Sequence, residues 1–73
     1  MSSAPKYRRA LGEAIRIHRR QVGLSQEKLA EKADLHPVYI STVERGVKTI
    51  SVDALMRIAK SLNVRVRDLV ADI

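Results

Sequence analysis

The side chains that could carry out catalysis or bind a metal are few in this chain. It has two histidines, His18 and His36, and no cysteine. His18 follows Leu11 and Ile15 on one helical stripe, a position typical of a packed, hydrogen-bonded imidazole. His36 precedes a proline, where a helix cap or a phosphate contact is expected. Two separated histidines without cysteine form neither a catalytic triad nor a metal site. We therefore expect no enzyme, no metal, no cofactor and no small-molecule ligand.

Another kind of chemistry is indicated by the hydroxyl and cationic side chains of residues 37–51. Such groups hydrogen-bond to phosphates and to base edges. The whole chain has 14 Lys and Arg residues against 8 Asp and Glu residues, a formal charge of +6. This balance favours a polyanionic partner, which is nucleic acid, an acidic protein or an anionic membrane. The alternative is an ordinary solvated surface, which would have the same numbers of charged residues.

The basic residues are unevenly distributed along the chain. Residues 1–22 contain six Lys or Arg residues and one Glu, and residues 47–73 contain five basic and three acidic residues. Residues 23–46 contain three basic and four acidic residues. Attraction to a polyanion must therefore come from the flanks of this central segment and from helix N-termini.

The length of 73 residues allows one domain, which would be marginally stable alone. Pairing with a second copy would supplement its core. An apolar content of 45% is enough for a compact fold. There is neither an apolar run of about 18 residues, as a membrane span requires, nor a secretory h-region. These features predict a cytoplasmic protein, associated with the bacterial nucleoid if it binds DNA, without a membrane segment.

Apolar residues recur at helical spacing in five segments, which predicts an all-α domain. The helices are placed at about 7–22, 26–33, 37–45, 52–62 and 65–71, after a disordered lead-in of residues 1–6. Residues 7–73 then form the domain. Ser25 and Ser51 are suitable N-caps, and Gly23 and Asn63 suit the ends of their helices.

The link between the second and third predicted helices is very short. Three residues lie between Ala33 and Pro37. Pro37 disfavours helical geometry at His36, and Asp34 tolerates left-handed backbone angles. Two helices joined in this way cross at roughly 90–120°. The second helix then stands out from the body of the domain and can enter a major groove.

Three stretches carry a family resemblance: GLSQEKLA at 23–30, YISTVERG at 39–46 and ISVDALMRIAKSLNV at 50–64. They resemble the lambda-repressor-like (Cro/XRE-type) DNA-binding family over about residues 11–70. The resemblance implies a compact five-helix domain with a helix-turn-helix. It also implies a sequence-specific transcriptional regulator that binds double-stranded DNA as a homodimer at a palindromic operator. The chain's size is most similar to restriction–modification controller proteins or small phage-type repressors.

Within the third helix, Ile40 and Val43 are expected to face the core. The outward face and the resemblance together predict a base-reading set of Pro37, Val38, Ser41, Thr42 and Arg45. Pro37 and Val38 depart from the usual pattern, because they cannot make bidentate hydrogen bonds to bases. Val38 is expected to pack on a thymine methyl group, or else to be a spare core residue. DNA shape should then carry much of the specificity.

A set of phosphate-binding residues is predicted around this helix: Gln26, His36, Tyr39, Lys48, Thr49 and Ser51. Gln26 begins a helix, where free N–H groups favour an anion. For Tyr39, the alternative to a phosphate contact is a partly buried packing role. Glu44 would repel phosphate and is expected to pair with Arg45, Arg16 or Lys48. The remaining arginines near the N-terminus either steer the protein onto DNA or form a solvated face: Arg8, Arg9, Arg19 and Arg20.

The apolar residues of the C-terminal segment exceed what one small core needs. Val66, Leu69, Val70 and Ile73 are predicted to form a dimer interface, and capping of the core is the alternative. A different function also stays open. The same fold serves in protein-binding adaptors and antitoxins, and the apolar Pro37 and Val38 are compatible with a protein as the main partner.

Overall fold

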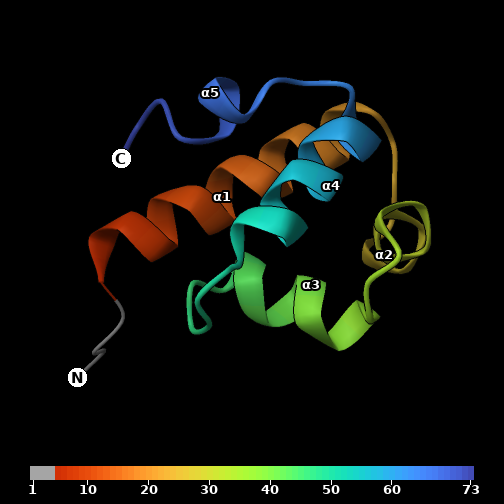
Figure 1. The fold of residues 1–73 in the computed structure, drawn as a ribbon, viewed down its shortest axis with the longest axis horizontal. Helices are drawn as coiled ribbons and strands as arrows, with labels where there is room; N and C mark the ends of the chain where they lie inside the picture. The colour runs from red at the N-terminus through yellow and green to blue at the C-terminus, as the bar shows by residue number, and fades with distance from the viewer. Residues whose placement is uncertain (1–4) are drawn as a thin grey trace.

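The computed structural model describes residues 5–73, and the regular structure in this part of the chain is helical (Figure 1). Its elements are α1 (Lys6–Gln21), α2 (Gln26–Ala33), α3 (Pro37–Glu44), α4 (Val52–Leu62) and α5 (Val66–Leu69). The predicted all-α, five-helix class is confirmed. In Figure 1, α3 and α5 lie at opposite edges of the molecule, with α1 between them.

The predicted lead-in of residues 1–6 falls mostly outside the described residues. Pro5 is the N-cap of α1, with φ −61° and ψ 148°, and Lys6 begins the helix. For Lys6 the prediction of disorder is therefore wrong. A proline at this place costs nothing, because the first N–H groups of a helix have no partner within it.

Short polar side chains determine where α2 and α4 begin. Ser25 Oγ accepts a hydrogen bond from the backbone N of Lys28 at 3.0 Å, and Ser51 Oγ accepts one from Ala54 at 3.1 Å. α4 ends at Asn63, which has a φ of 59°. Both predicted N-caps and this predicted C-cap are confirmed. Such a cap is worth about 1 kcal/mol over alanine.

Three predicted helices, the first, third and fifth, extend beyond their observed C-terminal ends. α1 ends at Gln21, one residue before its predicted end, and Val22 is 49% exposed because the chain turns away through Gly23 at φ 75°. α3 ends at Glu44, also one residue before its predicted end. α5 has four residues where 65–71 was predicted. Arg65 is extended, and its backbone N donates to the carboxylate of Asp68 at 2.9 Å, so the helix begins one residue later.

The core lies where the four longer helices meet. Small residues on α2, Ala30 and Ala33, are almost completely buried and allow close approach of α3 and α4. Six larger side chains are fully buried: Ile15, Leu29, Ile40, Ile58, Leu62 and Leu69. Burying each such side chain contributes about 1.5–3 kcal/mol. Burial of Ile40 fixes which face of α3 points into the core. The opposite face of α3 must therefore point outward.

α1 and α3 approach each other closely at Gly12. A Cβ atom added there would collide with the carbonyl oxygen of Val43 and lie 2.6 Å from that of Glu44. Backbone atoms cannot move aside as a flexible side chain would. The absence of a side chain at Gly12 is therefore what lets α3 lie directly on α1.

We expect Gly12→Ala to lower the free energy of unfolding by about 1–3 kcal/mol, the usual cost of overpacking. The increase in helix propensity from glycine to alanine would offset only part of this loss. Thermal unfolding followed by circular dichroism measures it. Glu13→Ala, at the exposed neighbouring position, should leave the melting temperature nearly unchanged. A Gly12→Ala protein as stable as the wild type would contradict the close packing.

Candidate nucleic-acid interface

The turn between α2 and α3 has the geometry that its sequence predicts. Asp34 is left-handed, with φ 57° and ψ 50°, and the backbone N of Leu35 donates to the Ala30 carbonyl at 2.8 Å. His36 is extended, and its ring Nδ1 accepts a hydrogen bond from the backbone N of Val38 at 3.1 Å. Of the two roles expected for His36, the structure shows the helix cap. α2 and α3 therefore form a helix-turn-helix.

The two faces of α3 differ as predicted. Ile40 and Val43 are 0% and 2% exposed, whereas Val38 is 61% exposed. The other predicted base-reading residues are accessible to differing degrees: Arg45 is exposed, and Pro37, Ser41 and Thr42 are half-buried. Val38 is thus a surface residue, and its alternative role in the core is wrong. Figure 1 places α3 at the lower edge of the molecule.

The polar side chains of α3 are partly committed to the helix itself. Thr42 Oγ1 donates its hydrogen to the Tyr39 carbonyl at 2.9 Å, which leaves it an acceptor towards a ligand. Arg45 Nε makes a long contact of 3.4 Å to the Ser41 carbonyl. A guanidinium has five N–H donors, so Arg45 retains donors for a base or a phosphate.

A buried ion pair connects α1 to the end of α3. Arg19 Nε donates to Glu44 Oε2 at 2.6 Å, and a second nitrogen of the same guanidinium donates to Oε1 at 3.0 Å. A third donates to the Leu24 carbonyl at 2.9 Å. The Glu44 side chain is 2% exposed. The parallel hydrogen bonds of this pair restrict its geometry, so it holds α3 at a defined angle to α1.

This pair corrects two sequence predictions. Glu44 pairs with none of Arg45, Arg16 and Lys48, and Arg19 is a buried partner of Glu44, not a charge on a solvated face. Arg16 instead bonds the exposed Glu13 at 2.8 Å, and this hydrogen bond raises the pKa of the Arg16 guanidinium. The spacing contained the missed signal. Arg19 follows Leu11 and Ile15 at intervals of four, so it lies on the buried stripe of α1.

Gln26 is oriented by the same ion pair. Its side-chain Nε2 donates to Glu44 Oε1 at 3.0 Å, and the residue is half-buried at the first position of α2. One N–H and the carbonyl oxygen of the amide remain for a ligand. Gln26 also borders an open hollow between α2 and α3, whose lining is Arg19, Ser25, Gln26, Glu27, Pro37, Val38 and Ser41. One predicted phosphate-binding residue and three predicted base-reading residues are thus neighbours.

A second group of predicted phosphate-binding residues surrounds the loop between α3 and α4. Tyr39 is half-buried, and its hydroxyl oxygen accepts a hydrogen bond from the backbone N of Ser51 at 3.3 Å. The ammonium of Lys48 lies 6.0 Å from the centre of the Tyr39 ring. Lys48, Thr49 and Ser51 are exposed. Tyr39 therefore combines both expected features: it packs, and its hydroxyl hydrogen is still available to a ligand.

The C-terminal residues divide between core and surface. Leu69 is 1% exposed and packs in the core, so its assignment to a dimer interface is wrong, because a buried side chain has no surface for a partner. Val66 and Val70 are half-buried and Ile73 is exposed. α4 adds two exposed apolar residues, Val52 and Met56, which the sequence interpretation missed although their spacing of four is visible.

Residues 5–73 show neither a metal-binding cluster nor a membrane-spanning helix. No cluster of three or more His, Cys, Asp or Glu residues is arranged there for a metal ion. None of the helices in this range has the length and apolar character of a membrane span.

The comparisons with known proteins agree with this fold. Residues 15–69 match the family model HTH_3, described as helix-turn-helix. Control protein C.BamHI of Bacillus amyloliquefaciens is 44% identical over 59 residues, which is 80% of this chain and 73% of that protein. The crystal structure of the restriction–modification controller protein C.AhdI from Aeromonas hydrophila superposes with a TM-score of 0.82 at 34% identity, covering 84% of this chain and 92% of that one.

A second similar structure is the biofilm regulator SinR in complex with DNA, with a TM-score of 0.78 and 33% identity. The match covers 81% of this chain and 95% of that one. The chain therefore belongs to the Cro/XRE-type helix-turn-helix family of DNA-binding transcriptional regulators.

Proposed function

We propose that this protein regulates transcription in the cytoplasm by binding a palindromic operator as a homodimer, with α3 of each copy in the major groove. The observation that carries the proposal is the accessible outer face of α3, beginning at Val38, on a helix whose opposite face is fixed by Ile40 and Val43. Similarity to C.BamHI and C.AhdI supports a role in the control of a restriction–modification system.

The residues assigned to DNA in this proposal have distinct tasks. Val38, Thr42 and Arg45 face base edges, together with Pro37 and Ser41. Gln26 offers its oriented amide and the first N–H groups of α2 to a phosphate, because a helix N-terminus favours an anion. Beyond the other end of α3, Lys48, Thr49 and Ser51 offer a second phosphate contact. Phosphate contacts at both ends would fix the register of the helix in the groove.

Selection of bound sites from random duplexes tests the proposal. We expect an inverted repeat whose half-sites are centred about one helical turn, roughly 34 Å, apart. The logarithm of the affinity should fall with the logarithm of salt concentration, by about 0.9 for each phosphate neutralised. An adaptor or antitoxin that binds only protein would enrich no sequence, and this result would refute the proposal.

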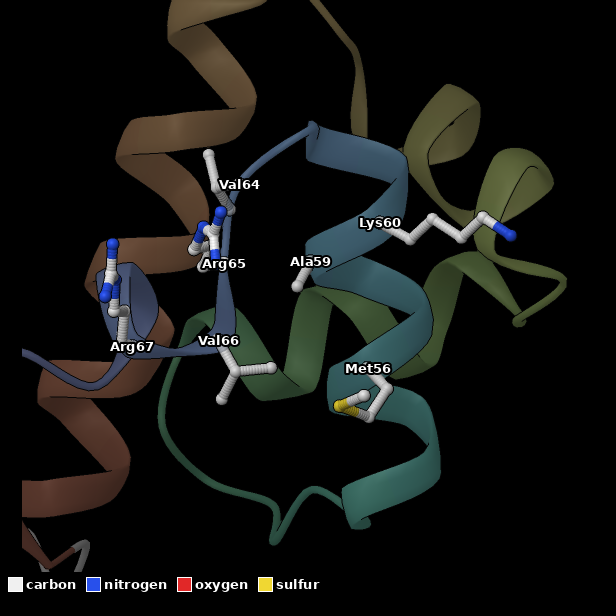
Figure 2. Close-up of a pocket in the computed structure, with 7 residues that line it drawn as sticks. All are labelled: Met56, Ala59, Lys60, Val64, Arg65, Val66 and Arg67. Atoms are coloured by element: carbon white, nitrogen blue, oxygen red, sulfur yellow. The ribbon is translucent and has the colours of Figure 1, made fainter.

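The dimer interface is proposed at the α4–α5 patch, which we define as Val52, Met56, Val66, Val70 and Ile73. In Figure 2 the side chains of Met56 and Val66 face one another across the hollow between α4 and α5, and Lys60 extends away from it. In Figure 1, α5 lies across α1 from α3, so a partner on α5 leaves α3 free.

Met56→Glu is expected to convert the dimer to a monomer and to weaken operator binding, since it places a charge in an apolar interface. Sedimentation equilibrium measures the change in mass. Met56 is 56% exposed in the single chain, so its fold should survive the substitution. Val22→Glu makes a similar change at a 49% exposed site outside the patch and should remain dimeric. A Met56→Glu protein that is still fully dimeric would exclude this patch.

A further inference from the structure

The most accessible part of the reading helix is apolar. Val38 is the second residue of α3 and is 61% exposed, and the half-buried Pro37 precedes it. Exposing a valine to water gains nothing for the fold, and truncating it would remove little buried surface. Neither side chain has a hydrogen-bond donor or acceptor. Val38 and Pro37 can therefore recognise a ligand only by its shape and by apolar contact.

The groups around Val38 narrow what that contact can be. The polar side chains that line the hollow together with Val38 are those of Arg19, Ser25, Gln26, Glu27 and Ser41. The amide and hydroxyl groups in this hollow suit a polar DNA surface, whereas an apolar protein partner would leave these groups without hydrogen-bond partners. In the major groove, donors and acceptors distinguish most base edges, and the apolar feature is the methyl group at C5 of a pyrimidine.

We propose that Val38, supported by Pro37, reads the methyl group of a 5-methylpyrimidine in each half-site. This inference rests on the proposed entry of α3 into the major groove. Thymine and 5-methylcytosine present the same methyl group at the same place. Both are therefore candidates, and cytosine methylation at the position facing Val38 would strengthen binding, whereas loss of the thymine methyl group would weaken it.

The test uses synthetic duplexes of the selected operator and the full-length protein, with binding followed by fluorescence anisotropy. Each thymine of one half-site is replaced in turn by deoxyuridine, which lacks the methyl group alone. At one position we expect affinity to fall about fourfold, the value of one buried methyl group, and about fifteenfold when both half-sites are changed. At the same position, a duplex with 5-methylcytosine should bind the protein more tightly than a duplex with cytosine, by a similar factor.

Val38→Ala should abolish the difference between thymine and deoxyuridine while overall binding persists. Val22→Ala, a matched change at an exposed valine away from α3, should preserve that difference. Equal binding of thymine and deoxyuridine at every position would overturn the inference and leave the DNA-binding function intact. Failure to bind any duplex would overturn both. A deoxyuridine effect without a 5-methylcytosine effect would support thymine as the base read and exclude methylated cytosine.

Discussion

Replacing Glu44 with alanine is expected to lower the free energy of unfolding by about 3–5 kcal/mol, because Arg19 would be left as an unpaired buried charge. The carboxylate accepts two hydrogen bonds from Arg19 and one from Gln26, and its side chain is 2% exposed. Small domains have total stabilities of about 5–15 kcal/mol. The variant would therefore lose much of its stability, which urea denaturation at 25 °C would measure.

Two further variants separate the buried charge from general damage. Glu13→Ala removes the exposed partner of Arg16 and should have a small effect, because exposed ion pairs contribute little. The double replacement Arg19→Met with Glu44→Leu removes both charges and should recover most of the stability lost by Glu44→Ala. If Glu44→Ala were as stable as Glu13→Ala, the pair would have no structural role.

Val38→Glu is expected to reduce affinity for the selected operator by at least about a hundredfold, because a carboxylate would face phosphates and base acceptors. Its melting temperature should stay close to that of the wild type, since surface substitutions usually change stability by less than about 0.5 kcal/mol. Anisotropy titration and thermal unfolding, run on the same preparation, give the two values.

Ile17→Glu is the matched control for the DNA-binding prediction. Ile17 is 45% exposed and lies on the opposite side of α1 from Ile15 and Arg19, the residues of its buried face. The same charge added there should weaken DNA binding only slightly. Equal losses from the two variants would mean that net charge, and not the position of Val38 on α3, determines the affinity.

Local signals accounted for the elements that position the site. α2 was predicted at its observed bounds because each end has its own determinant: Ser25 caps the first turn, and Asp34 leaves the helix in a left-handed conformation. The helix-turn-helix followed from Pro37, which excludes a continuous helix. Such effects depend on residues within one turn of each other, so they can be derived from sequence.

Most of the errors and omissions arose where the determining contact is distant in sequence. Glu44 and Arg19 are 25 residues apart, and nothing near Glu44 indicates which arginine it meets. The role of Gly12 depends on the carbonyl groups of α3, which approach it only in the folded domain. The short α5 is held by burial of Leu69 in a core built by other helices. At Glu44 and Gly12 a contact between elements decides the outcome, whereas the start of α5 is set locally, by the hydrogen bond from the Arg65 backbone N to Asp68.

The central claim is that the outer face of α3 contacts base edges in the major groove. Titrating the ¹⁵N- and methyl-labelled protein with its selected operator, and measuring NOEs between the Val38 methyl groups and the protons of the bases, tests it most directly. We predict such NOEs to one pyrimidine in each half-site, with amide shifts concentrated in residues 26 and 37–51. Shifts confined to α4 and α5, with no NOE from Val38, would contradict the claim.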